Sequence, residues 1–79
     1  MQESELLARI VVDPEILSGK PIVRGLRISV DQILRALAAG IPKEELLQEY
    51  PDLEPEDIRA CLLYAVHLVE NERVYPVPG

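Results

Sequence analysis

The sequence has no tryptophan and no phenylalanine, so its core must be built from aliphatic side chains. Its single cysteine, Cys61, excludes an internal disulfide. With only one histidine beside it, His67, the chain cannot supply the four ligands of a structural zinc site. It shows no secretory signal pattern and no apolar run near the length of a membrane span. We therefore expect a cytoplasmic protein without a metal or a cofactor, because a lone cysteine fits a reducing compartment.

A chain of 79 residues forms one domain. Domains of this size are marginally stable, and they are often helped by disulfides, a metal or oligomerisation. Since the first two are excluded, we expect a homodimer.

The net charge of −6 argues against indiscriminate nucleic-acid binding. The charge is uneven, however. Residues 18–35 carry one acidic residue, Asp31, against a basic set of four: Lys20, Arg24, Arg27 and Arg35. This distribution allows a local basic patch on an acidic protein.

The hydrophobic spacing predicts three helices. The first starts at Ser29, where Ser29 and Gln32 fit a capping box, and it ends at Gly40, where a left-handed residue is favoured. The second runs over 42–50, since Pro51 disfavours helical angles in the residue before it. The third and longest covers 54–71 and has Pro55 at its first helical position.

The longest predicted helix is almost apolar all round between residues 60 and 69. One face repeats at helical spacing and is predicted to be buried: Ile58, Cys61, Leu62, Ala65, Leu68 and Val69. Leu63, Tyr64 and Val66 lie off that face. A surface helix normally has a polar back, so we expect the fold to cover one side and a second copy or another protein to cover the other.

Short β elements are predicted before the helices. Residues 9–12 favour a strand, and 22–23 with 26–28 favour a hairpin around Arg24-Gly25. Residues 1–8 are expected to fray. The domain is thus predicted to cover 1–72, with an extended tail at 73–79 that is either disordered or a partner-binding arm carrying Val74, Tyr75 and Val77.

Several blocks together resemble one family of small bacterial and archaeal proteins over about residues 9–66. They are Arg9-Ile10 with Asp13-Pro14, Ser18-Gly-Lys-Pro-Ile-Val-Arg-Gly25, Arg27-Ile28, Tyr50-Pro51 with Leu53, and Glu56-Asp-Ile58. This pattern looks like the domain-of-unknown-function family numbered 433. Two positions depart from the family's habit: Leu26 and Glu54 stand where threonine is usual.

The resemblance implies a mostly α fold, a three-helix bundle of helix-turn-helix (homeodomain-like) type with a short N-terminal β-hairpin. It also implies dimers and an antitoxin-like role beside a PIN-like ribonuclease toxin. In a helix-turn-helix the recognition helix would begin at Glu54-Pro-Glu-Asp57, where three carboxylates would repel DNA phosphates. Any DNA binding would then fall to Lys20, Arg24, Arg27 and Arg35, whose alternative role is to pair with carboxylates.

Two functions remain open. The first is a non-enzymatic, antitoxin-like protein that holds the toxin nuclease inactive and represses its own operon. Its partner or dimer interface is predicted to comprise Leu63, Tyr64, Val66, His67, Val74, Tyr75 and Val77. The alternative is a stand-alone dimeric DNA-binding transcriptional regulator. An enzyme is not expected, because Cys61 has no base beside it and no other nucleophile or metal spacing stands out.

Overall fold

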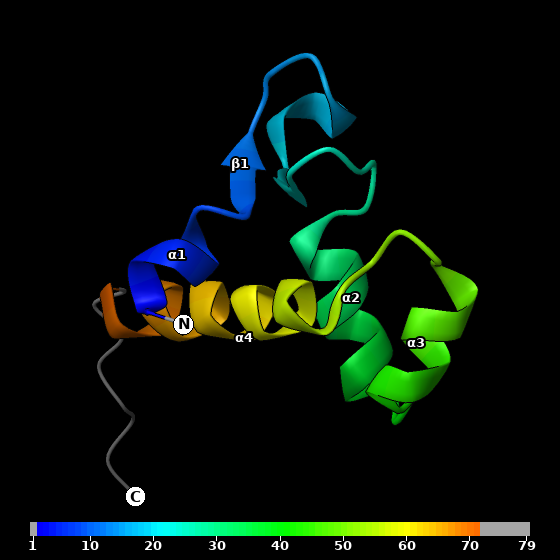
Figure 1. Ribbon diagram of the computed structural model, residues 1–79. Coiled ribbons are helices and arrows are strands. Elements are labelled where there is room, and N and C mark those ends of the chain that lie inside the picture. Colours follow the sequence, from blue (N-terminus) through cyan, green and yellow to red (C-terminus); the bar gives the residue numbers. More distant parts are fainter. Residues whose placement is uncertain (1, 72–79) are drawn as a thin grey trace, which may run out of the picture.

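The computed structural model describes residues 2–71. Four α-helices pack together, and a small two-stranded sheet lies to one side of α4 (Figure 1). In chain order the elements are α1 Glu3–Leu7, β1 Ile10–Val12, the 3-10 turn η1 Leu17–Gly19, β2 Pro21–Val23, α2 Val30–Ala38, α3 Lys43–Glu49 and α4 Pro55–Asn71. The predicted mostly α class and the three longer helices are confirmed. The predicted tail at 73–79 lies outside the described residues.

The expectation of only three helices is wrong, because residues 1–8 include helix α1. Leu6 is buried, and α1 packs against α4. A five-residue helix is too short to form alone, so this contact with α4 is what holds it. Local sequence signals could not reveal that contact.

Helix α2 begins and ends where its sequence predicts. The Ser29 hydroxyl accepts a hydrogen bond of 3.2 Å from the backbone N–H of Gln32. The return bond of a capping box is replaced, since the Gln32 amide donates instead to the Tyr50 hydroxyl at 3.0 Å. Gly40 follows the helix with a φ of 90°, a left-handed conformation that glycine adopts without strain.

The sheet pairs different segments from those expected. β1 runs antiparallel to β2, with Ile10 opposite Val23 and Val12 opposite Pro21. The predicted turn at Arg24-Gly25 is present, because the Leu26 N–H donates to the Val23 carbonyl at 3.0 Å. The Val23 N–H also donates to the Ile28 carbonyl at 3.0 Å. Residues 26–28 nevertheless form no strand. The second arm of the predicted hairpin is reduced to a single antiparallel bridge between Ile22 and Ser29, because Ser29 is already the cap of α2.

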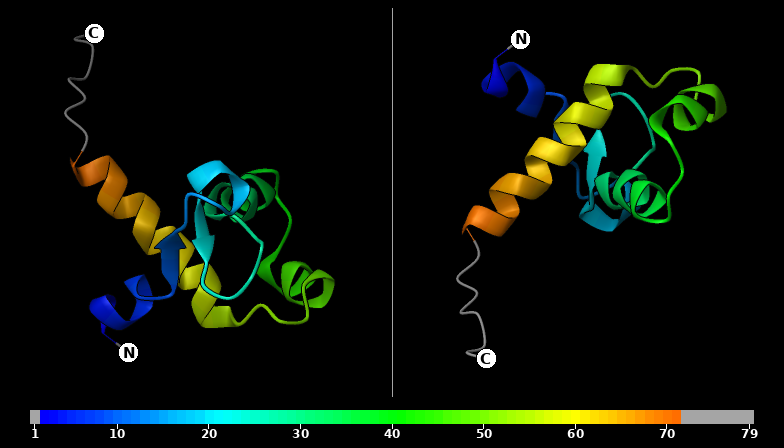
Figure 2. Two further views of the ribbon diagram at one scale, coloured as in Figure 1. Left: turned by 90° about the horizontal axis from the view of Figure 1, so that it is seen from above. Right: turned by 90° about the horizontal axis from the view of Figure 1, so that it is seen from below.

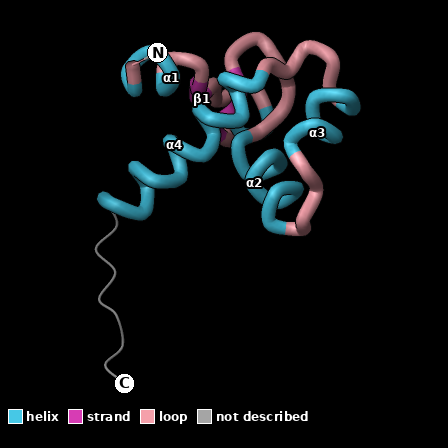
Figure 3. The backbone as a smooth tube through the Cα atoms, turned by 60° about the horizontal axis from the view of Figure 1, so that its bottom comes forward, coloured by secondary structure: helices cyan, strands magenta, loops and turns pink. Residues whose placement is uncertain are grey.

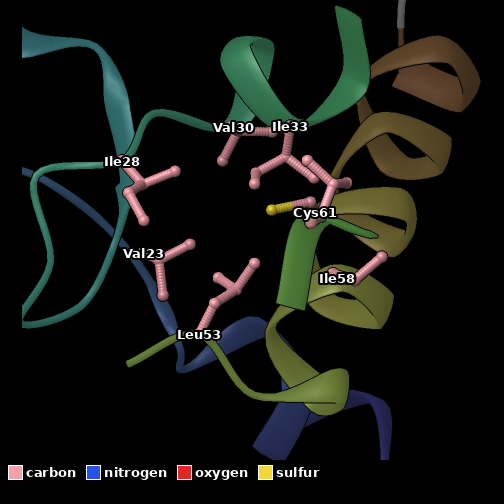
Figure 4. Packing of buried hydrophobic residues seen from close by; sticks show 8 residues of the cluster. Val23, Ile28, Val30, Ile33, Leu53, Ile58 and Cys61 are labelled. Atoms are coloured by element: carbon pink, nitrogen blue, oxygen red, sulfur yellow. The ribbon is translucent and has the colours of Figure 1, made fainter. Parts of the chain in front are cut away.

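The core is aliphatic, as the composition requires. Its side chains come from β2, α2, α3, α4 and the loops before α2 and α4, and they converge on Cys61 (Figure 4). The buried cluster comprises Val23, Ile28, Val30, Ile33, Leu46, Leu53, Ile58 and Cys61. Within residues 2–71, no helix is long and apolar enough to cross a bilayer.

Helix α4 is the element against which α1, α2, α3 and β1 pack. Figure 2 shows α1 on one side of it and α2 with α3 on the other. The last turns of α4 extend past the remaining elements (Figure 3). This projection decides which apolar side chains stay uncovered.

Candidate protein-binding surfaces on helix α4

The start of α4 is held by a buried carboxylate. Asp57 accepts a hydrogen bond of 2.8 Å from the backbone N–H of Glu54, and a second of 3.0 Å from Arg9. Arg9 also contacts Glu54 at 3.1 Å. These hydrogen bonds to Asp57 and Glu54 raise the pKa of the Arg9 guanidinium, which therefore stays charged.

The sequence predicted three carboxylates at the start of this helix that would face solvent, and this prediction is wrong for Asp57. Asp57 has only 6% of its side chain exposed and points inward. Asp57 caps the helix by accepting the backbone N–H of Glu54. This compensates for the loss of a threonine cap at position 54, since glutamate is a poorer N-terminal cap than threonine. Both Asp57 oxygens are engaged, and the local charge is partly neutralised by Arg9.

A polar concavity of about 180 Å³ lies beside this cluster. Its walls are formed by Arg9, Arg24, Gly25, Leu26, Asp52, Glu54 and Asp57. Both positive and negative groups line it, and Arg9 already pairs with Glu54 and Asp57. We assign this region to the stability of the fold.

The four predicted basic residues differ in their surroundings. Lys20 contacts Asp31 at 3.4 Å, whereas Arg24, Arg27 and Arg35 are exposed. Lys20 and Arg24 stand at opposite ends of β2, about 13 Å apart along an extended strand. The pKa of Asp31 is lowered, first by a hydrogen bond with Ser29 and then by the charge of Lys20.

The predicted buried face of α4 is only half right. Ile58 and Cys61 are buried, but Leu62, Leu68 and Val69 are 46%, 52% and 71% exposed. Val66 is 48% exposed. The helical periodicity is real, but α2 has only nine residues and covers α4 no further than about Tyr64. The last two turns of α4 continue the apolar pattern without cover.

The first uncovered surface, which we call the α2/α4 groove, has a volume of about 230 Å³. It is lined by Lys20, Pro21, Val30, Asp31, Leu34, Tyr64 and Leu68. The only charged groups in its lining are those of the Lys20–Asp31 pair. Tyr64, predicted to lie off the core, packs partly against the buried cluster and forms one wall of this groove.

The second surface, the α1/α4 groove, lies on the other side of the helix. Its volume is about 350 Å³, and it is lined by Glu3, Leu6, Arg59, Leu62, Leu63 and Val66. At about 100° per residue, Leu62 and Val66 point roughly 160° away from Tyr64 and Leu68. One helix therefore presents two separate apolar surfaces to solvent.

The predicted interface residues divide between these surfaces. Leu63 and Val66 line the α1/α4 groove, while Tyr64 lines the α2/α4 groove. His67 belongs to neither. It is half-buried, and its Nε2 finds no hydrogen-bond partner among the described residues. Val74, Tyr75 and Val77 lie outside the described residues.

Cys61 is fully buried in the core, as expected of a structural thiol. Burial raises its pKa to about 12, and the nearby Asp57 charge adds to the shift. A thiol in this environment is not a nucleophile near neutral pH.

Two residues that hold the start of α4 were not identified from the sequence. Asp57 stands three positions after the N-terminal cap, which is the position of a capping-box acid and could have been recognised. Arg9 gives no local signal, because its partners lie 45 and 48 residues away.

Comparison with known proteins confirms the resemblance found in the sequence. The family described as "Protein of unknown function (DUF433)" matches residues 10–65. The uncharacterised protein y4eO of Sinorhizobium fredii (strain NBRC 101917 / NGR234) is 39% identical over 56 residues, which is 71% of this chain. This chain spans 25% of that relative's length.

A similar fold has been solved by crystallography. The structure of a DUF433 member protein from Anabaena variabilis ATCC 29413 matches with a TM-score of 0.76 and 31% sequence identity. The match covers 85% of this chain and 66% of that one. This agreement supports the arrangement of helices and the small antiparallel sheet.

Proposed function

This chain belongs to the DUF433 family, and on that premise we propose that it is a non-catalytic, antitoxin-like protein that binds a PIN-like nuclease through the α2/α4 groove. The observation that carries the proposal is the uncovered apolar wall of this groove. Leu68 is 52% exposed, beside Leu34 and Tyr64. Apolar grooves of this kind favour the docking of another protein's apolar side chains.

Charge supports the choice of partner. The chain carries a net charge of −6, and a nuclease that handles RNA presents a basic surface. Opposite charges speed the encounter of two proteins, while the apolar groove supplies contact area. The Lys20–Asp31 pair beside the groove offers one group of each sign to orient the partner.

The experiment is co-expression with the product of the adjacent gene. Tagged full-length chain is expected to retain a small nuclease-like protein and to suppress its ribonuclease activity. Leu68→Asp places a charge in the groove and is expected to abolish co-purification. Val66→Asp is the matched control, because it adds the same charge on the same helix at similar exposure but on the other side.

Two results would overturn this proposal. One is the absence of any complex between the two products. The other is retention of the nuclease by Leu68→Asp at the level of the unsubstituted chain.

A second candidate function rests on a separate observation. Arg24 and Arg27 are exposed on the turn before α2, and the described residues give neither of them an ion pair. We propose DNA binding by this turn, with α2, α3 and α4 in a helix-turn-helix arrangement, as the means by which the protein represses its own operon. In the alternative form, the protein is a stand-alone regulator.

Fluorescence anisotropy with the protein's own promoter at low salt tests this candidate. Arg24→Ala and Arg27→Ala should each weaken binding evenly across sequences and lower the salt slope by about 1. Lys43→Ala, a basic residue on α3, is the matched control. If the anisotropy does not change with protein concentration at low salt, the protein does not bind this DNA and the second candidate function is wrong.

A further inference from the structure

We infer that the outer face of α4, formed by Leu62, Val66 and Val69, is covered by the same face of a second copy of this chain, packed antiparallel. This inference goes beyond nuclease binding, since it uses the side of α4 opposite the α2/α4 groove. It also assigns new residues to the interface, because Leu62 and Val69 were expected to be buried.

The face is a continuous stripe. Residues 62, 66 and 69 are spaced by four and three positions, so they fall within about 60° of one another around the helix. All three are 46% or more exposed. Ala65, half-buried at the edge of the stripe, is small and allows another helix to approach closely.

The charges at the two ends of the stripe favour self-association. Arg59 and Glu70 lie on the same flank of the stripe, about 60° and 80° from Leu62. They are eleven residues apart, which is about 16 Å along the helix. Both are exposed, and the described residues give neither an ion pair, although Glu3 lines the same groove as Arg59.

A two-fold axis perpendicular to α4, at the level between residues 64 and 65, pairs both charges of each copy. It reverses the helix direction and keeps the flank, so Arg59 of each copy faces Glu70 of the other. Leu62 then falls between Val66 and Val69 of the second copy. A parallel two-fold pairing would instead put Arg59 and Glu70 of the two copies on opposite flanks, so neither charge would meet an opposite one.

The end of α4 supports the same arrangement. Its last turn carries Glu70 and has no basic residue. A negative charge there opposes the helix dipole, whose C-terminal end favours cations. Arg59 of the second copy would supply the missing cation. A surface that is complementary to itself is typical of two-fold homodimers, and here the charges at the two ends of the stripe supply that complementarity.

Sedimentation equilibrium of the full chain, with helical circular dichroism as a check on folding, tests the inference. The unsubstituted chain is expected to be a dimer and Val66→Asp a monomer. Arg59→Glu and Glu70→Arg should each weaken the dimer about tenfold, because each breaks two ion pairs. The double variant Arg59→Glu/Glu70→Arg should restore the dimer, since it exchanges the charges across the axis.

Restoration of the dimer by the double variant is the most specific outcome of this test. In a parallel dimer the double variant would gain nothing over the single ones. The inference is overturned by an unsubstituted chain that stays monomeric at about 100 µM, or by a double variant no tighter than either single variant. Leu68→Asp should dimerise normally, so loss of nuclease binding and loss of the dimer can be told apart.

Discussion

Replacing Asp57 by alanine removes the acceptor that joins the start of α4 to the segment before β1. Two bonds are lost: the 2.8 Å bond from the Glu54 N–H and the 3.0 Å bond from Arg9. The first is a helix-capping bond, worth about 1 kcal/mol. The second is charge-assisted, worth about 1.5 kcal/mol at the low end, which applies because Arg9 is 22% exposed and keeps Glu54 as a partner.

The expected loss in the free energy of unfolding is therefore about 2.5 kcal/mol. For a domain of this size that corresponds to a fall in Tm of about 10–20 °C. Urea unfolding followed by helical circular dichroism measures the loss, and the slope should not change, because the folded surface stays the same.

Asp52→Ala is the control for this prediction. Asp52 is exposed and lines the same concavity, but the structure gives its side chain no hydrogen bond. Its replacement should change the free energy of unfolding by no more than about 0.5 kcal/mol. If Asp57→Ala lost less than about 1 kcal/mol, the Arg9–Asp57–Glu54 cluster would not stabilise the fold as argued.

Four further predictions concern the helix ends and the core. Ser29→Ala should lower the free energy of unfolding by about 1 kcal/mol through loss of the bond to Gln32, and an unchanged urea midpoint would contradict this. Gly40→Ala should cost about 1 kcal/mol, because alanine is strained at a φ of 90°, and a stabilised variant would refute the assignment. Cys61 should resist iodoacetamide at pH 8 until urea unfolds the chain; fast labelling of the folded protein would show that it is not buried. Because its pKa rises from 9.0 to about 12 on folding, the unfolded chain loses this proton first as the pH rises. The free energy of unfolding should therefore fall between those pH values relative to Cys61→Ala, and a constant difference between the two proteins would contradict this.

Local chemistry was enough to place the three longer helices. Ser29 and Gly40 mark the two ends of α2, while Pro51 and Pro55 separate α3 from α4. Each of these signals acts within one helical turn, through a capping bond, a left-handed residue or a missing N–H. That is why the limits of these helices could be predicted without knowing how they pack.

The candidate surfaces were predictable only in part. The excess of apolar residues in α4 correctly indicated uncovered surface, but the face chosen as buried was wrong at Leu62, Leu68 and Val69. Periodicity gives the direction of a side chain around its helix. It gives no information on how far the neighbouring helices extend, and α2 covers α4 only as far as about Tyr64.

The sequence by itself determined the ends of the three longer helices, the aliphatic core and the family, since each depends on neighbouring residues or on composition. Only the tertiary structure decided which strand pairs with β2, that Arg9 holds Asp57, and that α4 has two open sides. These features join segments far apart in the chain, so they depend on how whole elements pack against one another. No local pattern of residues encodes them.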